Sequence, residues 1–224
     1  MVVPPLLALV LAGLAAVTRV WLLAWPAAVL AALWVVYLAG APRALGKRAD
    51  GKMSMVAWLV WAPVFVYQWI AHEVLRRFSD EPVATEVGPG VWVGRRPRAS
   101  ELPEGVAIVV DLCAEFGAAR EVRTRSRYIA VPTLDASSPP PAEIARLVDA
   151  IEAAGGPALV HCALGHGRSA TVAAAVLVRR GDATLDDVEA KMRAVRPKIA
   201  LNPRQHAALA AAVAMRPPVT RKDR

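Results

Sequence analysis

One short stretch, residues 161–169 with the sequence HCALGHGRS, combines a thiol, an arginine and two glycines. A thiolate at Cys162 can act as a nucleophile, and the guanidinium of Arg168, six residues later, can hold two oxygens of a phosphoryl group. The glycines let the backbone wrap closely and turn its N–H groups inward. Ser169 can donate a hydrogen bond to the sulfur. The stretch predicts phosphate chemistry in which the thiolate attacks phosphorus and water then hydrolyses the cysteinyl-phosphate.

The segments on either side of this stretch are expected to position it. Pro157–Val160 is a short apolar run typical of a buried strand, and Ser169–Arg180 is an Ala/Val-rich run typical of a helix. A strand, a glycine-bearing loop and a helix N-terminus form a cradle for an anion, because backbone N–H groups and the helix dipole converge there. The same environment is expected to lower the pKa of Cys162. The alternative, a structural cysteine followed by an arginine by chance, does not account for this context.

The sequence HCALGHGRSA resembles the signature loop of the dual-specificity branch of the cysteine-dependent protein tyrosine phosphatase superfamily, and the resemblance extends from about residue 83 to 216. It implies an α/β fold, with a protein-tyrosine-phosphatase-like sheet flanked by helices. It also implies a phosphoric monoester hydrolase in which Cys162 is the nucleophile and Arg168 binds phosphate. His161 would tune the thiolate through a structural hydrogen bond. The substrate would be held by the loop residues Ala163, Leu164, Gly165, His166, Gly167 and Arg168.

A proton donor for the leaving group is predicted at Asp135, in the loop after a short strand at Tyr128–Val131. The resemblance places the family's acid loop there; the alternative is a turn-forming aspartate before Ser-Ser-Pro. Asp111 is a competitor, but it ends a buried strand and is expected to hold backbone or loop arginines. Glu115 is a weaker competitor.

Asn202 lies in RPKIALNPRQ, which resembles the family segment whose Asn or Gln positions the water of the second step. Capping the next helix is the favoured role for Asn202. The other elements expected along this part of the chain are a hairpin or edge strand at Glu86–Arg95, a buried strand at Val106–Cys113, and helices at Pro141–Ala154, at Leu185–Val195 after an N-cap at Thr184, and from Pro203 to about Met215.

The first 80 residues have a different composition, with six of the seven tryptophans of the chain. They contain three apolar runs, Val2–Val17, Val20–Leu38 and Met53–Ala71. About 20 apolar residues suffice to span a bilayer as a helix, so we expect two or three transmembrane helices, the first two forming a hairpin around Arg19. A signal peptide is disfavoured because the charged start is missing. A buried helical domain is disfavoured because no amphipathic period is present.

Basic residues flank the third run on both sides, in the loop Gly40–Lys52 and at Arg76 and Arg77. The positive-inside rule would put both flanks in the cytoplasm, which a single crossing forbids. Either the third run is re-entrant or interfacial, or the basic loop faces outward. A thiolate enzyme needs a reducing compartment, so a multi-pass membrane protein with a cytoplasmic catalytic domain is expected. The predicted domains are a membrane region 1–80, a catalytic domain 81–216 and a basic tail 217–224.

Composition restricts the remaining functions. The two cysteines do not form a disulfide framework, and the four histidines lack metal-ligand spacing, so we expect no metal and no cofactor. Cys113 could form a reversible disulfide with Cys162, although an inert buried cysteine is favoured. The net charge of +8 suits an anionic bilayer surface, and no nucleic-acid recognition module is apparent.

Three functions fit these observations. The first is a protein phosphatase acting on phosphotyrosine, phosphoserine or phosphothreonine. The second is a phosphatase of lipid or small polyol phosphates at the membrane surface, with substrates such as phosphatidylglycerophosphate. The third is a phosphate-binding pseudoenzyme or scaffold, which the intact set of Cys162, Arg168 and Asp135 disfavours.

Overall fold

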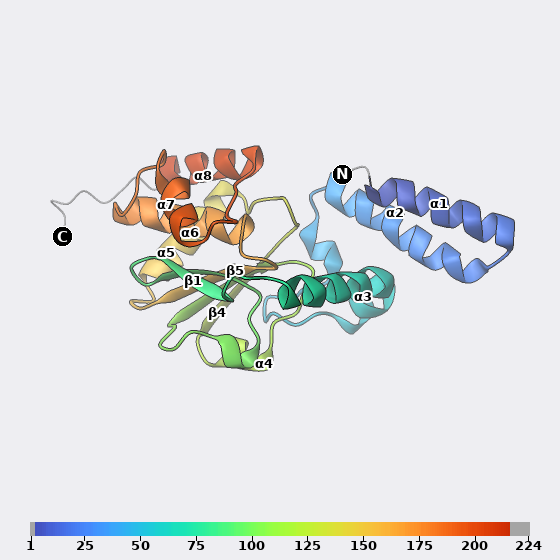
Figure 1. Ribbon diagram of the computed structural model, residues 1–224, viewed down its shortest axis with the longest axis horizontal. Coiled ribbons are helices and arrows are strands. Elements are labelled where there is room, and N and C mark those ends of the chain that lie inside the picture. Colours follow the sequence, from blue (N-terminus) through green and yellow to red (C-terminus); the bar gives the residue numbers. More distant parts are fainter. Residues whose placement is uncertain (1–2, 216–224) are drawn as a thin grey trace.

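The computed structural model describes residues 3–215, and its centre is a five-stranded sheet (Figure 1). The strand order is β1-β2-β5-β3-β4, with only β1 antiparallel to its neighbour. β1 and β2 form the expected hairpin. The central strands β3 and β5 are buried along their whole length, as expected for apolar runs in a parallel sheet. The strands are β1 (Ala84–Gly88), β2 (Val91–Arg95), β3 (Ile108–Cys113), β4 (Arg127–Thr133) and β5 (Ala158–Cys162).

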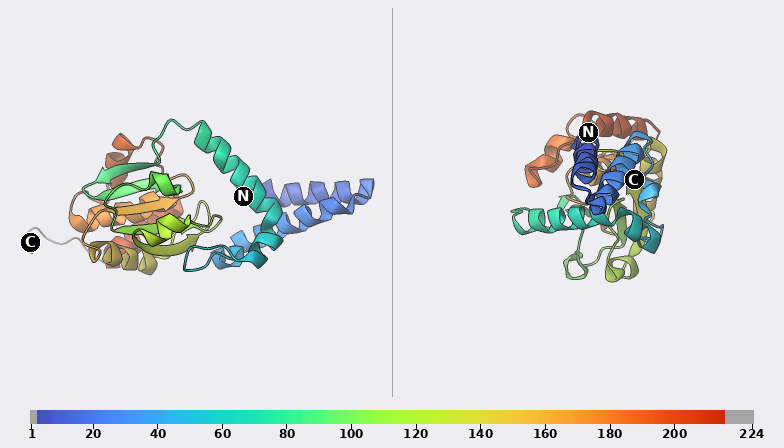
Figure 2. Two further views of the ribbon diagram at one scale, coloured as in Figure 1. Left: turned by 90° about the horizontal axis from the view of Figure 1, so that it is seen from below. Right: turned by 90° about the vertical axis from the view of Figure 1, so that its right-hand side faces the viewer.

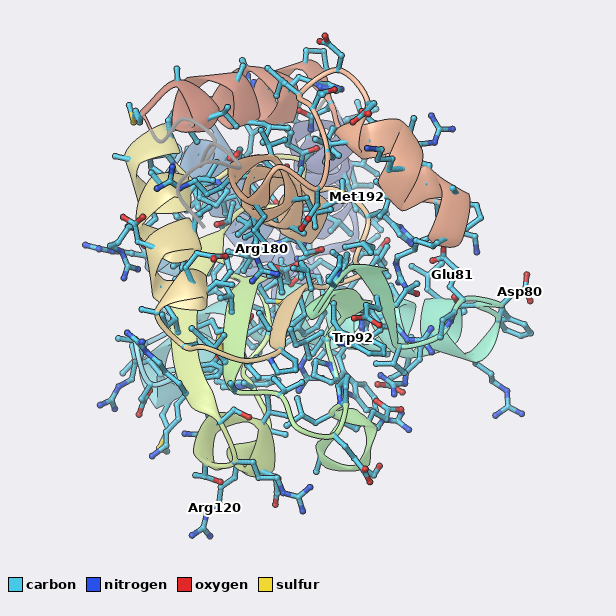
Figure 3. All side chains as sticks on the ribbon, turned by 90° about the vertical axis from the view of Figure 1, so that its left-hand side faces the viewer. Asp80, Glu81, Trp92, Arg120, Arg180 and Met192 are labelled. Carbon is cyan, nitrogen blue, oxygen red and sulfur yellow. The ribbon has the colours of Figure 1, made fainter. Side chains whose placement is uncertain are left out.

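Helices cover both faces of this sheet. Figure 1 shows α5–α8 on one face and the short α4 on the other, and in Figure 3 Arg120 of α4 points away from the sheet. The main core lies between the sheet and α5–α8 and is built from residues such as Ile144, Val160 and Val176. The helices are α4 (Arg120–Thr124), α5 (Pro141–Glu152), α6 (Arg168–Arg180), α7 (Val188–Val195) and α8 (Pro203–Met215). We call residues 84–215 the sheet unit.

The helix expected from Leu185 begins three residues later, at Val188. Thr184 and Asp187 bond each other's backbone instead: Thr184 N–H donates to Asp187 Oδ1 at 2.7 Å, and Asp187 N–H donates to Thr184 Oγ1 at 3.3 Å. This reciprocal pair is a capping box, and Val188 N–H donates to Thr184 O at 3.0 Å, so the turn at residues 184–187 leads into the helix and Thr184 has the predicted capping role.

The N-terminal segment forms three further helices, α1 (Val3–Thr18), α2 (Ala24–Leu38) and α3 (Met55–Arg77). α1 and α2 pack side by side as a hairpin that projects from the sheet unit (Figures 1 and 2). Its turn lies at Arg19, which has φ of 57°. By length and composition alone, Trp21–Leu38 and Met55–Arg77 could each cross a membrane, whereas Leu6–Thr18 is a shorter apolar helix. Short 3-10 helices occur at Trp21–Leu23, Pro42–Leu45 and Ala99–Glu101.

Helix α3 runs obliquely beside the sheet unit, and its C-terminal end leads back to β1 (Figure 2). Its buried residues Trp61 and Phe65 belong to the same apolar cluster as Ala114 and Leu134 of the sheet unit. At its C-terminal end Arg76 pairs with Glu101, and Glu73 pairs with Arg98.

The loop before α3 is also attached to the sheet unit. Gly51 O accepts a hydrogen bond from Ala118 N–H at 2.9 Å, and Asp50 O accepts one from Arg123 at 3.2 Å. The sheet unit is therefore contacted both by the loop that precedes α3 and by the C-terminal end of α3. The domain boundary at residue 80 remains a prediction, and the tail 217–224 lies outside the described residues.

Candidate active site

Cys162 ends β5, and α6 begins at Arg168, so the loop that joins a strand to a helix N-terminus forms as the sequence predicts. The Sγ atom of Cys162 accepts a hydrogen bond from Gly165 N–H at 3.2 Å and lies 3.4 Å from Ser169 Oγ. Gly165 has φ of 80°, and a Cβ there would lie 2.5 Å from the backbone of Gly94. Only glycine fits this position, because the loop packs closely on β2.

The environment of Cys162 favours its thiolate. Burial alone would raise the pKa of the thiol, but the positive charge of Arg168 and hydrogen bonds from Ser169 and Gly165 outweigh it, so the pKa of Cys162 lies below its ordinary value. This lowering of the pKa of Cys162 agrees with the expectation from the strand–loop–helix pattern.

The guanidinium of Arg168 is buried and held in place on several sides. It donates to Glu115 Oε1 at 2.7 Å and Oε2 at 2.9 Å, and to Thr133 O at 2.7 Å. Burial disfavours the charged form of Arg168, but the carboxylate of Glu115 more than offsets this and raises the pKa of Arg168 well above its ordinary value. Burial alone would raise the pKa of Glu115, but the positive charge of Arg168 and its hydrogen bonds outweigh burial, so the pKa of Glu115 is lowered.

Sequence reasoning treated Glu115 only as a weak competitor for the proton-donor role. Its position two residues after β3 carried a signal that was missed. Because β3 and β5 are parallel neighbours, the segment after β3 lies at the same sheet edge as the loop after β5. An acidic residue there can reach the arginine of that loop.

Asp135 lies at the same pocket as Cys162 and Arg168. Its Oδ1 is 3.1 Å from Nη2 of Arg168, and its side chain is 74 % exposed. The loop behind it is tied to α8, because Asn202 Nδ2 donates to Ala136 O at 2.9 Å and Gln205 Nε2 donates to Ser137 O at 3.0 Å.

Asn202 also caps α8. Its Oδ1 accepts Gln205 N–H, and its own N–H donates to Gln205 Oε1, both at 3.0 Å. This reciprocal pair is a capping box. Gln205 was not singled out from the sequence, although Asn-x-x-Gln before an apolar run is a recognisable signal. It is 2 % exposed and lines the pocket beside Gly167.

Other residues hold the loop 162–168 from outside. The buried Arg196 donates to Leu164 O and Gly165 O, each at 3.1 Å. His166 lines the pocket, but its Nε2 lies 2.6 Å from Glu81 of the segment before β1, which Figure 3 shows beside α7. Arg196 was not predicted from the sequence; the only sign was an arginine in the segment between two helices.

His161 and Asp111 are buried side by side, with His161 Nε2 3.7 Å from Asp111 Oδ2. Burial lowers the pKa of His161 despite the opposing charge of Asp111. Asp111 was expected to hold backbone or loop arginines. It does accept Cys113 N–H at 2.8 Å, but its side-chain partners are Lys47 and Tyr128, each at 2.6 Å.

Among residues 3–215, one cluster brings metal-ligand atoms together: Asp111, Cys113 and His161, within 4.8 Å of one another. The cluster suits a metal poorly, since the ammonium of Lys47 already neutralises the carboxylate. Burial raises the pKa of Cys113, and Asp111 and Glu115 raise it further, so its thiol is protonated.

The pocket above Cys162 has a volume of about 410 Å³, and α3 forms one of its walls. Tyr67, Ala71 and Leu75 line that wall. His72 is buried there, with Nε2 3.2 Å from Ala163 O of the loop and its ring 5.1 Å from that of Phe116. A helix apolar enough to enter a membrane therefore touches the loop that carries Cys162.

Comparison with known proteins agrees with this geometry. The family "Dual specificity phosphatase, catalytic domain" matches residues 97–213, a little over half of the chain. The structure of Tk-PTP in its active form is 26 % identical, with a TM-score of 0.53, and the match covers 58 % of this chain and 96 % of that one. Human DUSP28 is 25 % identical, with a TM-score of 0.51 and coverages of 60 % and 96 %. No curated protein sequence matches the chain.

The structure of PTPMT1 in complex with PI(5)P is also similar, at 21 % identity and a TM-score of 0.52, with coverages of 59 % and 96 %. At this identity the likeness shows the fold alone. α1–α3 lie outside the residues that the family matches. The chain belongs to the dual specificity phosphatase family and is a cysteine-dependent phosphoric monoester hydrolase with an apolar N-terminal extension.

Proposed function

We propose that the chain is a membrane-attached phosphatase that removes a terminal phosphate from a phospholipid at the bilayer surface. The observation that carries the proposal is the pocket wall formed by α3. Residues of this helix line the pocket of Cys162, while apolar side chains elsewhere on it are exposed. A lipid could place its phosphate on the loop and its glycerol and acyl groups along α3. The exposed apolar residues include Val56, Leu59, Val66, Ile70 and Val74.

In this proposal the hairpin of α1 and α2 enters the membrane and α3 lies along its surface. α3 is attached to the sheet unit near both ends, through the loop that precedes it and through Glu73 and Arg76. If α3 lies at the membrane interface and does not cross the bilayer, the basic residues before and after it lie on the same side of the membrane as the sheet unit. This arrangement removes the conflict with the positive-inside rule. The positive-inside rule assigns that side to the cytoplasm, where a thiolate stays reduced.

We propose the following roles in catalysis. The thiolate of Cys162 attacks phosphorus, so an Sγ–P bond forms as the P–O bond to the leaving group breaks. Asp135, as the carboxylic acid, gives its proton to the departing oxygen. The Asp135 carboxylate then takes a proton from a water that attacks phosphorus, which releases phosphate and returns the thiolate. The hydrogen bond from Ser169 Oγ stabilises the departing sulfur.

Arg168 would hold two non-bridging phosphate oxygens, exchanging its contact with Asp135 for one with substrate. Glu115 keeps the guanidinium oriented through both of its oxygens. Gln205, buried beside Gly167, is the candidate for placing the water of the second step, and Asn202 supports it as a cap. Arg168 is the one arginine or lysine of the loop 162–168, and Nε2 of His166 lies 2.6 Å from Glu81. A single phosphate group therefore suits the site better than a polyphosphorylated headgroup.

The test is a substrate panel on the full chain in detergent or lipid nanodiscs, since Lys47 and α3 contribute to the sheet unit. The panel contains para-nitrophenyl phosphate, phosphatidylglycerophosphate, phosphatidic acid, and phosphotyrosine and phosphoserine peptides, with Cys162→Ser as control. We expect a phospholipid to give the highest kcat/KM and Cys162→Ser to abolish turnover. A phosphopeptide that is turned over faster than either lipid would support the protein-phosphatase alternative. Unchanged turnover in Cys162→Ser would overturn the mechanism.

A further inference from the structure

We propose a second, non-catalytic site that binds the headgroup of an anionic phospholipid, in a groove between the C-terminal half of α3 and the segment that begins at Arg95. The groove has a volume of about 500 Å³ and shares no lining residue with the pocket of Cys162. The proposal rests on the membrane attachment proposed above but not on the identity of the substrate.

One side of the groove is apolar and belongs to α3. Trp69, Ile70 and Val74 line it and are 54 %, 51 % and 50 % exposed. They continue the exposed apolar surface of the helix toward its C-terminal end. Tryptophan is favoured at the level of lipid headgroups, where one end of the ring is in an apolar and the other in a wet environment. This side of the groove suits glycerol and the first acyl carbons.

The other side of the groove carries an excess of positive charge. Four arginines line it, against one glutamate: Arg76, Arg77, Arg95, Arg98 and Glu73. Two of the arginines are already paired, Arg98 with Glu73 at 2.5 Å and Arg76 with Glu101.

The other two arginines, Arg77 and Arg95, have no side-chain hydrogen bond or ion pair within residues 3–215. The Nε of Arg95 is buried and unpartnered. Burial, and then the nearby charge of Arg76, lower the pKa of Arg95. A phosphodiester would supply the missing acceptors and neutralise the excess charge, since arginine bonds phosphate oxygens through its planar fork.

A phospholipid fits this groove better than free phosphate because the basic and apolar sides face the same space. Free phosphate would leave Trp69, Ile70 and Val74 uncovered. The groove and the pocket of Cys162 lie along one helix, with Leu75 lining the pocket and Val74 lining the groove. A lipid bound in the groove would hold α3 at the bilayer surface and thereby fix the height of the pocket wall.

The experiment measures thermal unfolding of the full chain in detergent during titration with dioleoyl phosphatidylglycerol. Parallel titrations use dioleoyl phosphatidylcholine and inorganic phosphate. A ligand that binds only the folded state raises Tm in a saturable way, and we expect this from phosphatidylglycerol and not from phosphatidylcholine. Inorganic phosphate is expected to raise Tm through Arg168 in the catalytic pocket, and the double variant described next should leave that rise unchanged. Replacing both arginines, Arg77→Gln with Arg95→Gln, is expected to raise the half-saturating concentration by about tenfold or more. Arg193→Gln, which removes one exposed charge on α7, is the control.

Two further measurements keep the outcomes distinct. The double variant should hydrolyse para-nitrophenyl phosphate as the parent does, which shows that it is folded. Glu115→Gln, which is expected to weaken phosphate binding in the catalytic pocket through Arg168, should keep the response to phosphatidylglycerol, and this separates the groove from the catalytic site. The proposal is overturned if the double variant responds to phosphatidylglycerol as the parent does, or if phosphatidylcholine stabilises the chain equally well. If the double variant loses its response to inorganic phosphate, the groove binds free phosphate and not a lipid headgroup, which also overturns the proposal.

Discussion

The ammonium group of Lys47 lies 2.6 Å from Oδ2 of Asp111, and both side chains are buried, at 0 % and 1 % exposure. Lys47 belongs to the loop between α2 and α3, whereas Asp111 lies on β3, an interior strand of the sheet. The same carboxylate accepts the hydroxyl of Tyr128 and lies beside His161, which precedes Cys162. The loop that joins the apolar helices therefore completes the interior of the sheet unit.

Lys47→Met is expected to destabilise the chain by about 3–5 kcal/mol, because it leaves the Asp111 carboxylate buried without its cation. In the parent chain, burial alone would raise the pKa of Asp111. Lys47, with smaller contributions from His161 and Tyr128, outweighs burial and holds that pKa well below its usual value. Thermal unfolding in detergent measures the change. Lys52→Met is the matched control, since Lys52 is 57 % exposed and its pair with Asp50 contributes little.

The combined variant Lys47→Met with Asp111→Asn should recover part of the lost stability, because the amide needs no cation. If Lys47→Met unfolds at the temperature of Lys52→Met, the buried ion pair has no structural role. The same pair explains why a fragment starting at residue 81 is expected to be less stable than the full chain.

Ser169→Ala is expected to raise the pKa of Cys162, because it removes a hydrogen bond that favours the thiolate. The folded-state pKa of this thiol is lowered, so the thiolate is populated above that value and protonated as the pH falls through it. The acid limb of kcat/KM should therefore move to higher pH in the variant. The rate of alkylation by iodoacetamide as a function of pH reports the thiolate directly. Ser100→Ala, on an exposed residue, should leave the curve in place, and coincident curves for Ser169→Ala and the parent would exclude this role.

Glu115→Gln is expected to weaken phosphate binding by about tenfold or more, because the amide NH2 cannot accept one of the two hydrogen bonds from Arg168 and the other loses the negative charge of its acceptor. The guanidinium then loses the bidentate contact that orients it. The inhibition constant of orthovanadate and the KM for para-nitrophenyl phosphate both measure this effect. Glu143→Gln breaks a comparable bidentate pair with Arg146 on the surface of α5 and should change neither. Equal inhibition constants in both variants would contradict the positioning role of Glu115.

Asp135→Asn tests the proposed proton donor. Without the acidic proton, substrates with a basic leaving group should be hydrolysed far more slowly, by about 10²-fold or more. Substrates whose leaving group is already acidic should be spared. A series of aryl and alkyl phosphates gives the dependence of kcat/KM on leaving-group pKa. A loss that is equal across the series would move the donor role to another residue.

Much of the site was predictable from the sequence because its parts are local. Cys162, Arg168 and Ser169 are fixed by one strand–loop–helix segment, and the apolar runs of β3 and β5 each indicate a buried strand. The capping role of Asn202 follows from a motif of four residues. In each case the pattern and the interaction it specifies lie within a few residues of each other.

The interactions that the sequence did not predict join distant segments. Arg168 and Glu115 are 53 positions apart, and Lys47 and Asp111 are 64 positions apart. A charge pattern along the chain does not specify which acid meets which base across a sheet edge. The position of α3 is a similar case. Composition marks it as apolar enough for a membrane, but only its packing against Ala114 and Leu134 shows that it lies along the sheet unit.

The α3 wall of the pocket is expected to affect large and small substrates differently. Leu75→Gln changes the α3 wall of the pocket without touching Cys162 or Arg168. If acyl or glycerol groups lie along this wall, kcat/KM for a phospholipid substrate should fall by about five- to thirtyfold, on the order of 1–2 kcal/mol for the lost apolar contact. The value for para-nitrophenyl phosphate, which is too small to extend along the wall, should stay constant. Leu59→Gln makes the same change at an exposed α3 position outside the pocket, so it controls for membrane affinity. A parallel loss with both substrates, or an equal loss in Leu59→Gln, would mean that α3 attaches the enzyme to the membrane without contacting its substrate.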